Sequence, residues 1–341
     1  MSTKKVLVTG GLGYIGSHTV VCLQEAGYHV LIIDDCSNSS EEVLDGIIEI
    51  TGIRPEFERL DLRDKTAVSD YFNKHTDIDG IIHFAASKAV GESVADPLKY
   101  YENNLGGLVY VLQNCVAHGI DNFIFSSSCT VYGEPDSLPI DENALVKPAT
   151  SPYGNTKQVG EEIILESCGA YDLQAISLRY FNPIGAHDSA KIGELPLGVP
   201  QNLVPFITQT AAGLRDELQV FGSDYPTPDG SCIRDYIHVV DLAEAHVIAL
   251  SRLFQKKNLA AFEVFNVGTG AGSSVFEIIK TFEKVSGKAL PHKISDRRSG
   301  DVIAVYADTH KANEVLGWKA RFSSEDALAS AWKWEQKIRA K

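Results

Sequence analysis

The sequence lacks the long apolar runs that membrane-spanning helices require. No apolar stretch reaches the about 18 residues of a transmembrane segment. No positively charged start with an apolar core precedes the first apolar segment, so we expect no Sec signal peptide. These absences predict a cytoplasmic protein that neither crosses a membrane nor is exported through one.

Cysteine is scarce and scattered. The chain contains six cysteines, with no CxxC pair and no spacing typical of a zinc site. We therefore expect reduced, mostly structural thiols and no bound metal.

Positive charge is also in short supply. The chain has 31 Lys and Arg against 45 Asp and Glu, a formal net charge of −14. Nucleic acids and anionic membranes select basic surfaces, so we expect neither as a partner. Any anionic ligand must meet positive groups that are concentrated locally.

The remaining composition describes an ordinary globular protein. The 341 residues are 44% hydrophobic and 22% charged, and we find no internal repeat or low-complexity tract. A chain of this length suggests about two domains and easily buries a core.

The first 35 residues carry the strongest pattern in the chain. An apolar run is followed by a turn with Gly10, Gly13 and Gly16, a helix-length segment, a second apolar run and then Asp34. This order is typical of the βαβ unit that binds a dinucleotide. Gly10 turns the chain tightly, Gly13 lets the backbone approach a pyrophosphate, and Gly16 lets the helix pack on the sheet.

The acid at the end of the second run indicates which dinucleotide binds. A carboxylate at Asp34 can accept hydrogen bonds from the adenosine ribose and repels a 2′-phosphate. No Lys or Arg lies between Lys5 and Arg54 to neutralise such a phosphate. We therefore predict NAD as the cofactor, rather than NADP.

Strands and helices alternate through the first half of the chain. We expect strands at 56–60, 80–86 and 122–126 and helices at 41–51, 64–75 and 97–118. This alternation predicts an α/β fold with a doubly wound parallel sheet of the Rossmann type. Ligands bind beyond the carboxyl ends of such strands, where 61–62, 84–86, 126–128 and 179–182 fall.

The composition changes after residue 181. Prolines and glycines punctuate the stretch from 183 to 230, which marks the start of a second, smaller α/β domain. We expect residues 1–181 to form the NAD-binding domain and 182–341 to form the substrate domain. Segments within 233–267 look able to return to the first sheet.

Tyr153 and Lys157 form a candidate catalytic base. Pro152 suits the first turn of a helix, from which residues four apart project on one face. Holding a tyrosine as phenolate near neutral pH requires about 4 kcal/mol. A cation at about 6 Å in an effective dielectric of 20 supplies about 2.8 kcal/mol. Lysine alone falls short, so a positively charged nicotinamide must make up the difference.

Three serines follow the fifth expected strand. Ser126, Ser127 and Ser128 place hydroxyls where a substrate oxygen can sit, although serine clusters at strand ends often serve only turn geometry. We favour Ser128, because Thr130, Val131 and Tyr132 follow it as in the family described next.

These residues together resemble the extended short-chain dehydrogenase/reductase family. More narrowly, four strings are similar to the UDP-glucose 4-epimerases, also called UDP-galactose 4-epimerases: His83–Ala85, Lys88–Val94, Leu178–Pro183 and Arg234–Val239. The resemblance covers nearly the whole chain.

The resemblance implies a reaction without net oxidation. Tyr153 would take the proton from the sugar 4-hydroxyl while hydride passes from C4 to tightly held NAD, with Ser128 bonded to the same oxygen. The 4-keto sugar would turn over and accept the hydride on its other face. Lys157 would lower the pKa of Tyr153 and bind the nicotinamide ribose. A homodimer is also implied, paired through the helices after Pro97 and Pro152.

The resemblance and the strand ends also indicate the binding residues. The expected NAD-binding residues are Gly10, Gly13, Tyr14, Ile15, Gly16, Asp34, Asp35, Asn38, Asp61, Leu62, Phe84, Ala85, Ala86, Lys88, Asn103, Ser126, Tyr153, Lys157 and Tyr180. The expected UDP-sugar-binding residues are Lys88, Ser128, Tyr153, Phe181, Asn182, Asn202, Leu203, Arg234, Arg298, Asp301 and Val305.

Two positions separate related activities. Sugar-nucleotide dehydratases carry an Asp-Glu pair where this chain has Cys129 and Thr130, so no acid serves an elimination here. Bacterial epimerases restricted to UDP-glucose and UDP-galactose have a tyrosine matching Val305. The smaller valine either leaves room for a 2-acetamido group, so that UDP-GlcNAc and UDP-GalNAc also react, or fills the core.

Other functions stay open at this point. One is another UDP-sugar epimerase or decarboxylase, and the other is a non-catalytic, NAD-sensing regulator. Loss of Tyr153 or Lys157 would favour the regulator, and both are present. The epimerase chemistry itself serves both galactose metabolism and the supply of nucleotide sugars for glycans.

Overall fold

Seven parallel strands form the centre of the larger part of the molecule. The computed structural model describes residues 3–298 and 301–340. Its large sheet has the order β11-β6-β5-β4-β1-β2-β3. The strands are β1 (Lys5–Thr9), β2 (His29–Asp34), β3 (Glu56–Arg59), β4 (Gly80–His83), β5 (Asn122–Ser126), β6 (Gln174–Tyr180) and β11 (Phe262–Val267).

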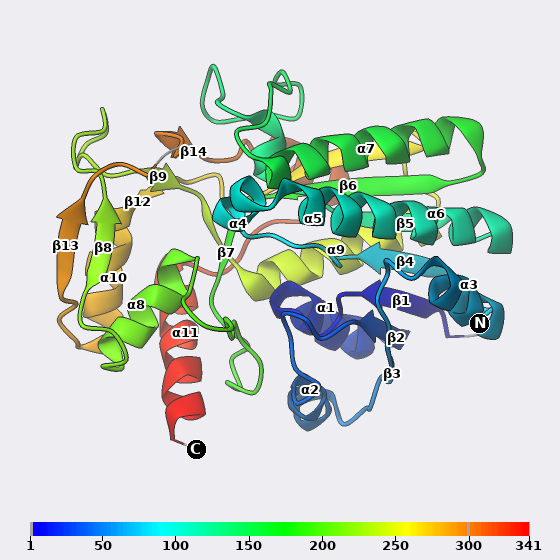
Figure 1. The fold of residues 1–341 in the computed structure, drawn as a ribbon, viewed down its shortest axis with the longest axis horizontal. Coiled ribbons are helices and arrows are strands. Elements are labelled where there is room, and N and C mark those ends of the chain that lie inside the picture. The colour runs from blue at the N-terminus through cyan, green and yellow to red at the C-terminus, as the bar shows by residue number, and fades with distance from the viewer. Residues whose placement is uncertain (1–2, 299–300, 341) are drawn as a thin grey trace.

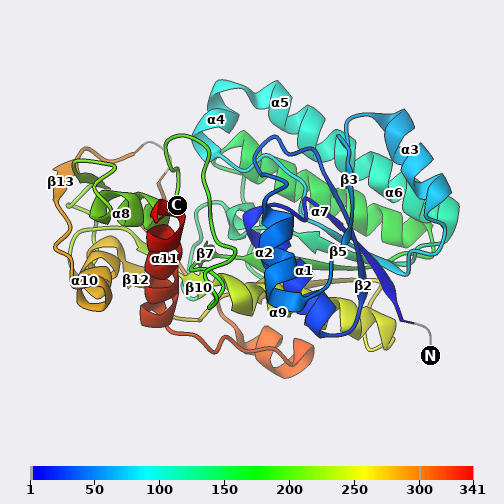
Figure 2. The same cartoon turned by 90° about the horizontal axis from the view of Figure 1, so that it is seen from below.

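Helices cover both faces of this sheet, which explains why its strands are apolar almost throughout. One face packs against α3 (Lys65–Lys74), α6 (Gly107–His118) and α7 (Pro152–Ala170). The other face packs against α1 (Tyr14–Glu25), α2 (Val43–Thr51) and α9 (Val239–Phe254). Figure 1 shows the strands stacked from β6 down to β3, and in Figure 2 α3 and α6 lie on the upper side of the molecule and α9 on the lower side. The predicted doubly wound α/β fold is confirmed.

The strand order reverses between β1 and β4. β1 pairs with β2 on one side and with β4 on the other, all in parallel. In such sheets the loops at the switch point diverge and leave a place for a ligand at the carboxyl ends.

A smaller part lies beyond the carboxyl ends of the strands (Figures 1 and 2). Its core includes Ile207, Val220, Phe282 and Leu328. It contains α8 (Leu203–Ala211), α10 (Val275–Ser286) and α11 (Ser324–Arg339) with short strand groups: β7 (Asn182–Ile184) with β10 (Tyr236–His238), β8 (Leu218–Phe221) with β13 (His292–Ser295), and β9 (Ile233–Arg234) with β12 (Ser273–Ser274) and β14 (Ala304–Val305).

Most expected elements occur with small shifts at their ends. The helix expected at 64–75 is α3, and the Asp64 side chain caps it by accepting from the backbone N–H groups of Thr66 and Ala67 at 3.0 Å. The strand expected at 80–86 stops at His83, because the chain leaves the sheet there toward α4 (Val90–Ala95). The helix expected at 41–51 begins at Val43.

The long helix expected at 97–118 is interrupted. α5 (Pro97–Tyr101) runs into a π-helical turn, Glu102–Gly106, before α6 continues. The turn places the buried Asn104 so that its amide bonds the carbonyl of Ser87 and the hydroxyl of Thr156, both at 3.0 Å. An inserted π turn re-aims side chains and is frequent at functional sites.

The segment 233–267 only partly rejoins the large sheet. β11 pairs with β6 and α9 packs on the sheet, but β9 and β10 pair with strands of the smaller part instead. Asp235 lies between these two strands, and its buried carboxylate accepts from the backbone N–H groups of Thr269, Gly270 and Ala307.

The chain has no helix, over the ranges that the structure describes, with both the length and the apolar character needed to cross a bilayer. All six cysteines are free thiols.

Candidate active site

The turn between β1 and α1 forms the first wall of the site. Gly10 has φ +70°, and a Cβ there would lie 2.8 Å from the backbone nitrogen of Ala85. A Cβ on Gly16 would lie 2.2 Å from the carbonyl oxygen of Gly10. Both approaches are too close for any side chain, so glycine is required where the turn meets the loop after β4.

The N-terminus of α1 is open to an anion. Gly13 is the N-cap, no side chain caps the helix, and its first turn, with Tyr14 and Ile15, contains no acid. The first backbone N–H groups of a helix have no partner within the helix and attract negative charge. This geometry fits the pyrophosphate of a dinucleotide.

Asp34 lies at the end of β2 beside this turn and is 8% exposed. Its carboxylate accepts hydrogen bonds from Leu12 N at 3.0 Å, Cys36 N at 2.9 Å and Ser39 Oγ at 2.8 Å. Burial raises its pKa, which these three donors oppose. Asp34 therefore holds the glycine turn through its bond to Leu12 N, and it lies where a hydroxyl of the adenosine ribose is expected to bind.

The expected residues next to Asp34 are more exposed. Asp35 accepts from the backbone and hydroxyl of Ser37, and Asn38 lies on the surface. Arg59 of β3 reaches the Asp35 carbonyl at 3.3 Å. Arg59 therefore lies beside Asp35 in the fold, although the sequence contains no Lys or Arg between Lys5 and Arg54.

The carboxylate of Asp61, after β3, is engaged by a neighbour. Arg63 donates to it from Nε at 3.0 Å and from NH2 at 2.6 Å, and these bonds lower the pKa of Asp61. Leu62 is buried and faces Gly107 of α6, where a Cβ would lie 3.0 Å from the Leu62 Cβ. Leu62 therefore packs in the core between the sheet and α6, in addition to its expected place beside the cofactor.

The loop after β4 contributes an aromatic wall and a lysine. Phe84 and Tyr180 lie against His246 of α9, with ring centroids 4.6 and 6.3 Å away. Burial lowers the pKa of His246 to about 4, so the ring is neutral and this wall is uncharged near pH 7. Lys88 lies 5.9 Å from the ring centroid of Tyr14 on the opposite wall.

Ser87 ties this loop to the π-helical turn. Its backbone N–H donates to Asn104 Oδ1 at 2.8 Å, and Asn103 Nδ2 donates to its hydroxyl at 3.3 Å. Asn103 is therefore bonded to Ser87, the residue between the expected Ala86 and Lys88.

Tyr153 and Lys157 lie on one face of α7, as predicted from their spacing. Ser151 caps this helix and Pro152 occupies its first turn. Tyr153 is 7% and Lys157 4% exposed, and the lysine Nζ lies 6.0 Å from the tyrosine ring centroid. The lysine also donates to the carbonyl of Ser126 at 2.8 Å.

Burial acts against charge on both side chains. It raises the pKa of Tyr153 well above 10, and a hydrogen bond with Ser128 lowers it again in part. Burial lowers the pKa of Lys157 to about 8. A further positive group near Tyr153 is therefore needed before the phenolate can form at neutral pH.

The serines after β5 face different partners. Ser128 lies beside Tyr153 and lowers its pKa, and the Ser128 hydroxyl accepts from Thr130 N at 3.2 Å at the start of a short 3-10 helix, Cys129–Tyr132. Ser126, the last residue of β5, lies beside Tyr180 and lowers the pKa of that tyrosine against the effect of burial. The structure thus gathers Ser126, Ser128, Tyr153, Lys157 and Tyr180 at one point.

Opposite this point lie the expected arginines of the smaller part. Arg234 in β9 pairs with Asp301 at 3.5 Å, and Asp301 N bonds the carbonyl of Arg298 at 3.3 Å. Val305 in β14 is in register with Arg234. Val305 is 7% exposed and packs in a cluster with Val131, Tyr132, Ile140, Phe181 and Ala307.

Asn182 and Asn202 flank the same region from two loops. Asn182 begins β7, and its backbone N–H bonds the Asp235 carbonyl at 2.9 Å. Asn202 is the N-cap of α8, just before Leu203, but its side chain instead donates to Glu194 at 2.6 Å. Glu194 also lies 3.5 Å from the Lys88 nitrogen.

Two residues at the site were not predicted from the sequence. Glu194 joins Lys88 and Asn202, and Phe221 at the end of β8 lies under the guanidinium of Arg298, 4.4 Å from ring centroid to Cζ. Neither belongs to a recognisable local pattern. The only sequence signal for Phe221 is its place at the end of an apolar run followed by Gly222.

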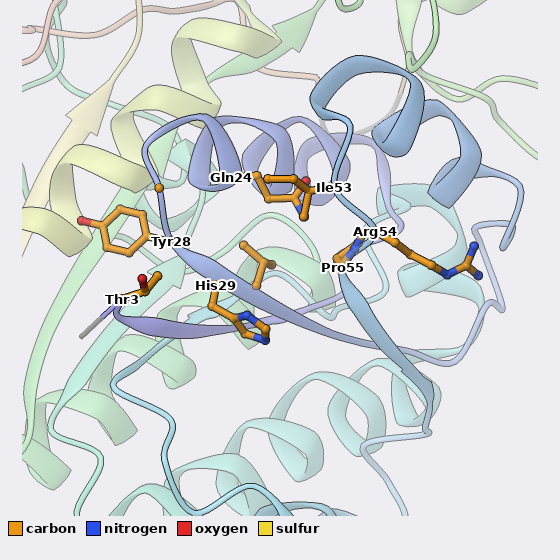
Figure 3. A pocket seen from close by; sticks show the side chains of 9 residues that line it. Thr3, Gln24, Tyr28, His29, Ile53, Arg54 and Pro55 are labelled. Carbon is orange, nitrogen blue, oxygen red and sulfur yellow. The ribbon is translucent and has the colours of Figure 1, made fainter. Parts of the chain in front are cut away.

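A surface cavity of about 220 Å³ lies elsewhere, and Figure 3 shows its lining. Thr3, Tyr28, His29 and Pro55 contribute to it at the amino ends of β1, β2 and β3. The switch point of the sheet and Tyr153 belong to the opposite, carboxyl edge. This cavity is therefore separate from the candidate site.

The two walls together suit a dinucleotide and a second anionic ligand. The bare helix start at Gly13, the buried Asp34 and the neutral wall at Phe84 fit the phosphates, ribose and nicotinamide of NAD. Arg234 and Arg298 offer charge-assisted bonds to another diphosphate.

Comparison with known proteins identifies relatives over the full chain. The family model described as the NAD dependent epimerase/dehydratase family matches residues 6–268. A UDP-glucose 4-epimerase of Bacillus subtilis is 49% identical over 331 residues, covering 97% of this chain and 96% of the relative.

Solved structures agree with the sequence relatives. A UDP-glucose-4-epimerase from Stenotrophomonas maltophila, with bound NAD and formylated UDP-arabinopyranose, superposes with a TM-score of 0.95 at 46% identity, covering 99% of this chain and all of that chain. A UDP-glucose 4-epimerase from Bifidobacterium longum, in complex with NAD+ and UDP, gives a TM-score of 0.94 at 44% identity and covers 98% and 99%.

Proposed function

Because the chain belongs to the NAD-dependent epimerase/dehydratase family, we propose that it interconverts UDP-glucose and UDP-galactose. The enzyme is an NAD-dependent isomerase that inverts C4 of the sugar through a 4-keto intermediate, with no net oxidation. The observation that carries this function is the buried Tyr153, with Ser128 beside it and the Lys157 nitrogen 6.0 Å from its ring centroid.

We assign the proton transfer to Tyr153. Its phenolate takes the proton of the sugar 4-hydroxyl and later returns it to the 4-keto oxygen, which the Ser128 hydroxyl also bonds. Lys157 stabilises the phenolate and bonds the nicotinamide ribose. The chemistry that NAD supplies when bound is acceptance of the C4 hydride and its return to the other face. The 4-keto sugar turns over between the two transfers.

The UDP-sugar is held mainly by the smaller part. Arg234 and Arg298 neutralise the diphosphate in a protein whose net charge is −14. Asn182 and Asn202 bond polar groups of the substrate, and Asp301 keeps Arg234 in place. In this proposal residues 1–181, with α9 and β11, bind NAD, and the remaining residues bind the UDP-sugar.

The experiment that tests this function uses the purified protein without added NAD. Incubation with UDP-galactose, followed by chromatography of the UDP-sugars, should yield UDP-glucose. Absence of product even with NAD supplied would refute the assignment, and UDP-glucuronate and UDP-xylose would be the next substrates to test.

We propose that the site also accepts the N-acetylated sugars, because valine at 305 is small. Val305→Tyr should lower turnover of UDP-GlcNAc relative to UDP-galactose by about 10-fold or more, since an added ring excludes the 2-acetamido group. Val305→Ala is the control that should keep both activities. Wild-type enzyme active on UDP-galactose but inert on UDP-GlcNAc would contradict the proposal. Melting temperatures show whether the ring instead overpacks the cluster around Phe181.

We propose a homodimer that acts in the cytoplasm. Exposed apolar side chains lie on the helices expected to pair: Leu98 on α5 is 78% exposed, Val116 on α6 is 41% and Leu165 on α7 is 54%. Burying such a patch favours association. Light scattering should give twice the chain mass of 37.1 kDa. A monomer at micromolar concentration would contradict the dimer, and recovery in a membrane or secreted fraction would contradict the location.

A further inference from the structure

Glu161 continues the face of α7 that carries Tyr153 and Lys157. The three residues follow at intervals of four, so each lies one helical turn beyond the last. The side chain of Glu161 is only 8% exposed. A charged group at such a position is stable only with several partners.

The partners of Glu161 come from two strands. Its Oε1 accepts from the Ser127 hydroxyl of the β5 end at 2.6 Å and from the Ser177 hydroxyl of β6 at 2.9 Å. Arg179 of β6 donates from Nε at 3.0 Å and from NH2 at 2.6 Å. The guanidinium lies 4.8 Å from the ring centroid of Tyr132.

Ser127 links this group to the reacting side chains. The carbonyl of its neighbour Ser126 accepts from Lys157 Nζ at 2.8 Å, and its other neighbour, Ser128, lies beside Tyr153 and lowers the pKa of that side chain. Ser126 and Ser127 thus bond two successive turns of α7, and Ser128 lies beside Tyr153 of the preceding turn. Moving Ser127 would therefore move both of its neighbours relative to the helix.

We propose that Glu161 is a positioning residue, which through Ser127 holds the end of β5 in register with α7 and, one helical turn beyond Lys157, places a fixed negative charge on the same face of the helix. The proposal rests on the proposed epimerase function. Glu161 touches neither Tyr153 nor any expected ligand position, so it acts only through these neighbours.

The charges around Lys157 support the second half of the proposal. On α7 it has Tyr153 and Glu161, and the negative charge of Glu161 raises its pKa against the effect of burial. Across from it on β4, His83 has a pKa of about 3 and is therefore neutral. The other titratable groups that act on the neighbouring Tyr153 are Tyr180, Cys129 and Tyr100. Burial raises the pKa of each, so none is an anion near pH 7.

Glu161→Gln tests the charge. The amide leaves Arg179 uncompensated and removes the anion beside Lys157, so the pKa of Lys157 should fall. Because neutral Lys157 cannot stabilise the phenolate, kcat falls as pH rises through this pKa. The alkaline limb of the kcat profile should therefore move down by about one pH unit or more. The Cε chemical shift of Lys157, assigned with Lys157→Arg, should follow the same titration without turnover.

Ser127→Ala tests whether the Ser127–Glu161 bond sets the position of the β5 end relative to α7. It leaves every charge in place and removes one hydroxyl, so kcat on UDP-galactose should fall about 10-fold or more with little change in KM or in the alkaline limb. This variant keeps the proposal testable if Glu161→Gln does not fold.

The matched control is Glu263→Gln. Arg252 of α9 bonds Glu263 of β11 in a second buried bidentate pair at 2.8 and 3.0 Å, with side chains 9% and 7% exposed. Glu263 lies near the amino end of its strand, away from the site. The melting temperature of this variant should fall, as we also expect for Glu161→Gln. Its pH profile for kcat should remain that of the wild-type enzyme.

Wild-type turnover of UDP-galactose tests the proposed function separately. Given that turnover, wild-type kcat in Ser127→Ala, or an unmoved alkaline limb and Lys157 titration in folded Glu161→Gln, would overturn the positioning role. The same shift in Glu263→Gln would also overturn it, because it would reflect a general loss of stability.

Discussion

Tyr153→Phe should lower kcat for UDP-galactose by about 100- to 10,000-fold, the range that a positioned acid-base group contributes. Phenylalanine keeps the ring that packs beside Ser128 and Lys157 but has no hydroxyl to accept the 4-hydroxyl proton. Because the glycine turn and Asp34, expected to hold the pyrophosphate and the adenosine ribose, are unchanged in this variant, bound NAD and the melting temperature should stay near the wild-type values. The measurement is initial-rate chromatography of UDP-glucose formed.

Tyr101→Phe provides the matched control for this change. Tyr101 belongs to α5, and its hydroxyl accepts from Asn155 Nδ2 on the same helix as Tyr153, at 2.8 Å. Removing this hydroxyl should change kcat by no more than about twofold. Activity of Tyr153→Phe within tenfold of wild type would exclude Tyr153 as the base.

Gly16→Ala should remove NAD from the purified protein and with it the activity. The new Cβ would lie 2.2 Å from Gly10 O and 2.9 Å from the Cα of Gly11. Both neighbours are backbone, so the turn must open, and the first N–H groups of α1 lose their common direction. Overpacking of this kind costs about 1–3 kcal/mol of the free energy of unfolding. Release of cofactor by denaturation and a thermal melt measure both effects.

Gly169→Ala is the control for this change. It introduces an alanine into a helix without the clash that Gly16→Ala creates. Gly169 lies near the end of α7, where a Cβ would meet nothing within 4 Å. Alanine there should stabilise the helix by about 0.5–1 kcal/mol and leave NAD content unchanged. A Gly16→Ala protein that retains full NAD and the wild-type melting temperature would show that the helix start does not hold the pyrophosphate.

The sequence was sufficient to predict the large sheet, because its signals are local. Apolar runs buried on both faces, Asp64 as a helix cap and the glycines of the first turn each act within a few residues. The spacing of Tyr153 and Lys157 likewise predicted their common face. Their catalytic roles, like those of the other site residues, stay predictions.

The remaining features depend on contacts between distant segments. The π-helical turn forms where Asn104 meets Ser87 and Thr156, 17 and 52 residues away, and nothing within 97–118 marks it. Glu161 resembles any surface glutamate of a helix until β6 brings Arg179 to it. Phe221 becomes part of the site only because Arg298, far along the chain, lies on its ring.

The position of β11 at the edge of the large sheet affects how the protein is made. β6 ends at Tyr180, yet its outer partner is complete only at Val267, after 87 further residues have been added. At 5–20 residues per second a ribosome needs about 4–17 s for this interval. Throughout that time β6 presents an unpaired parallel edge to other nascent chains, which is where aggregation begins. The larger part is therefore completed during synthesis only after most of the smaller part's strands and α8 have left the ribosome.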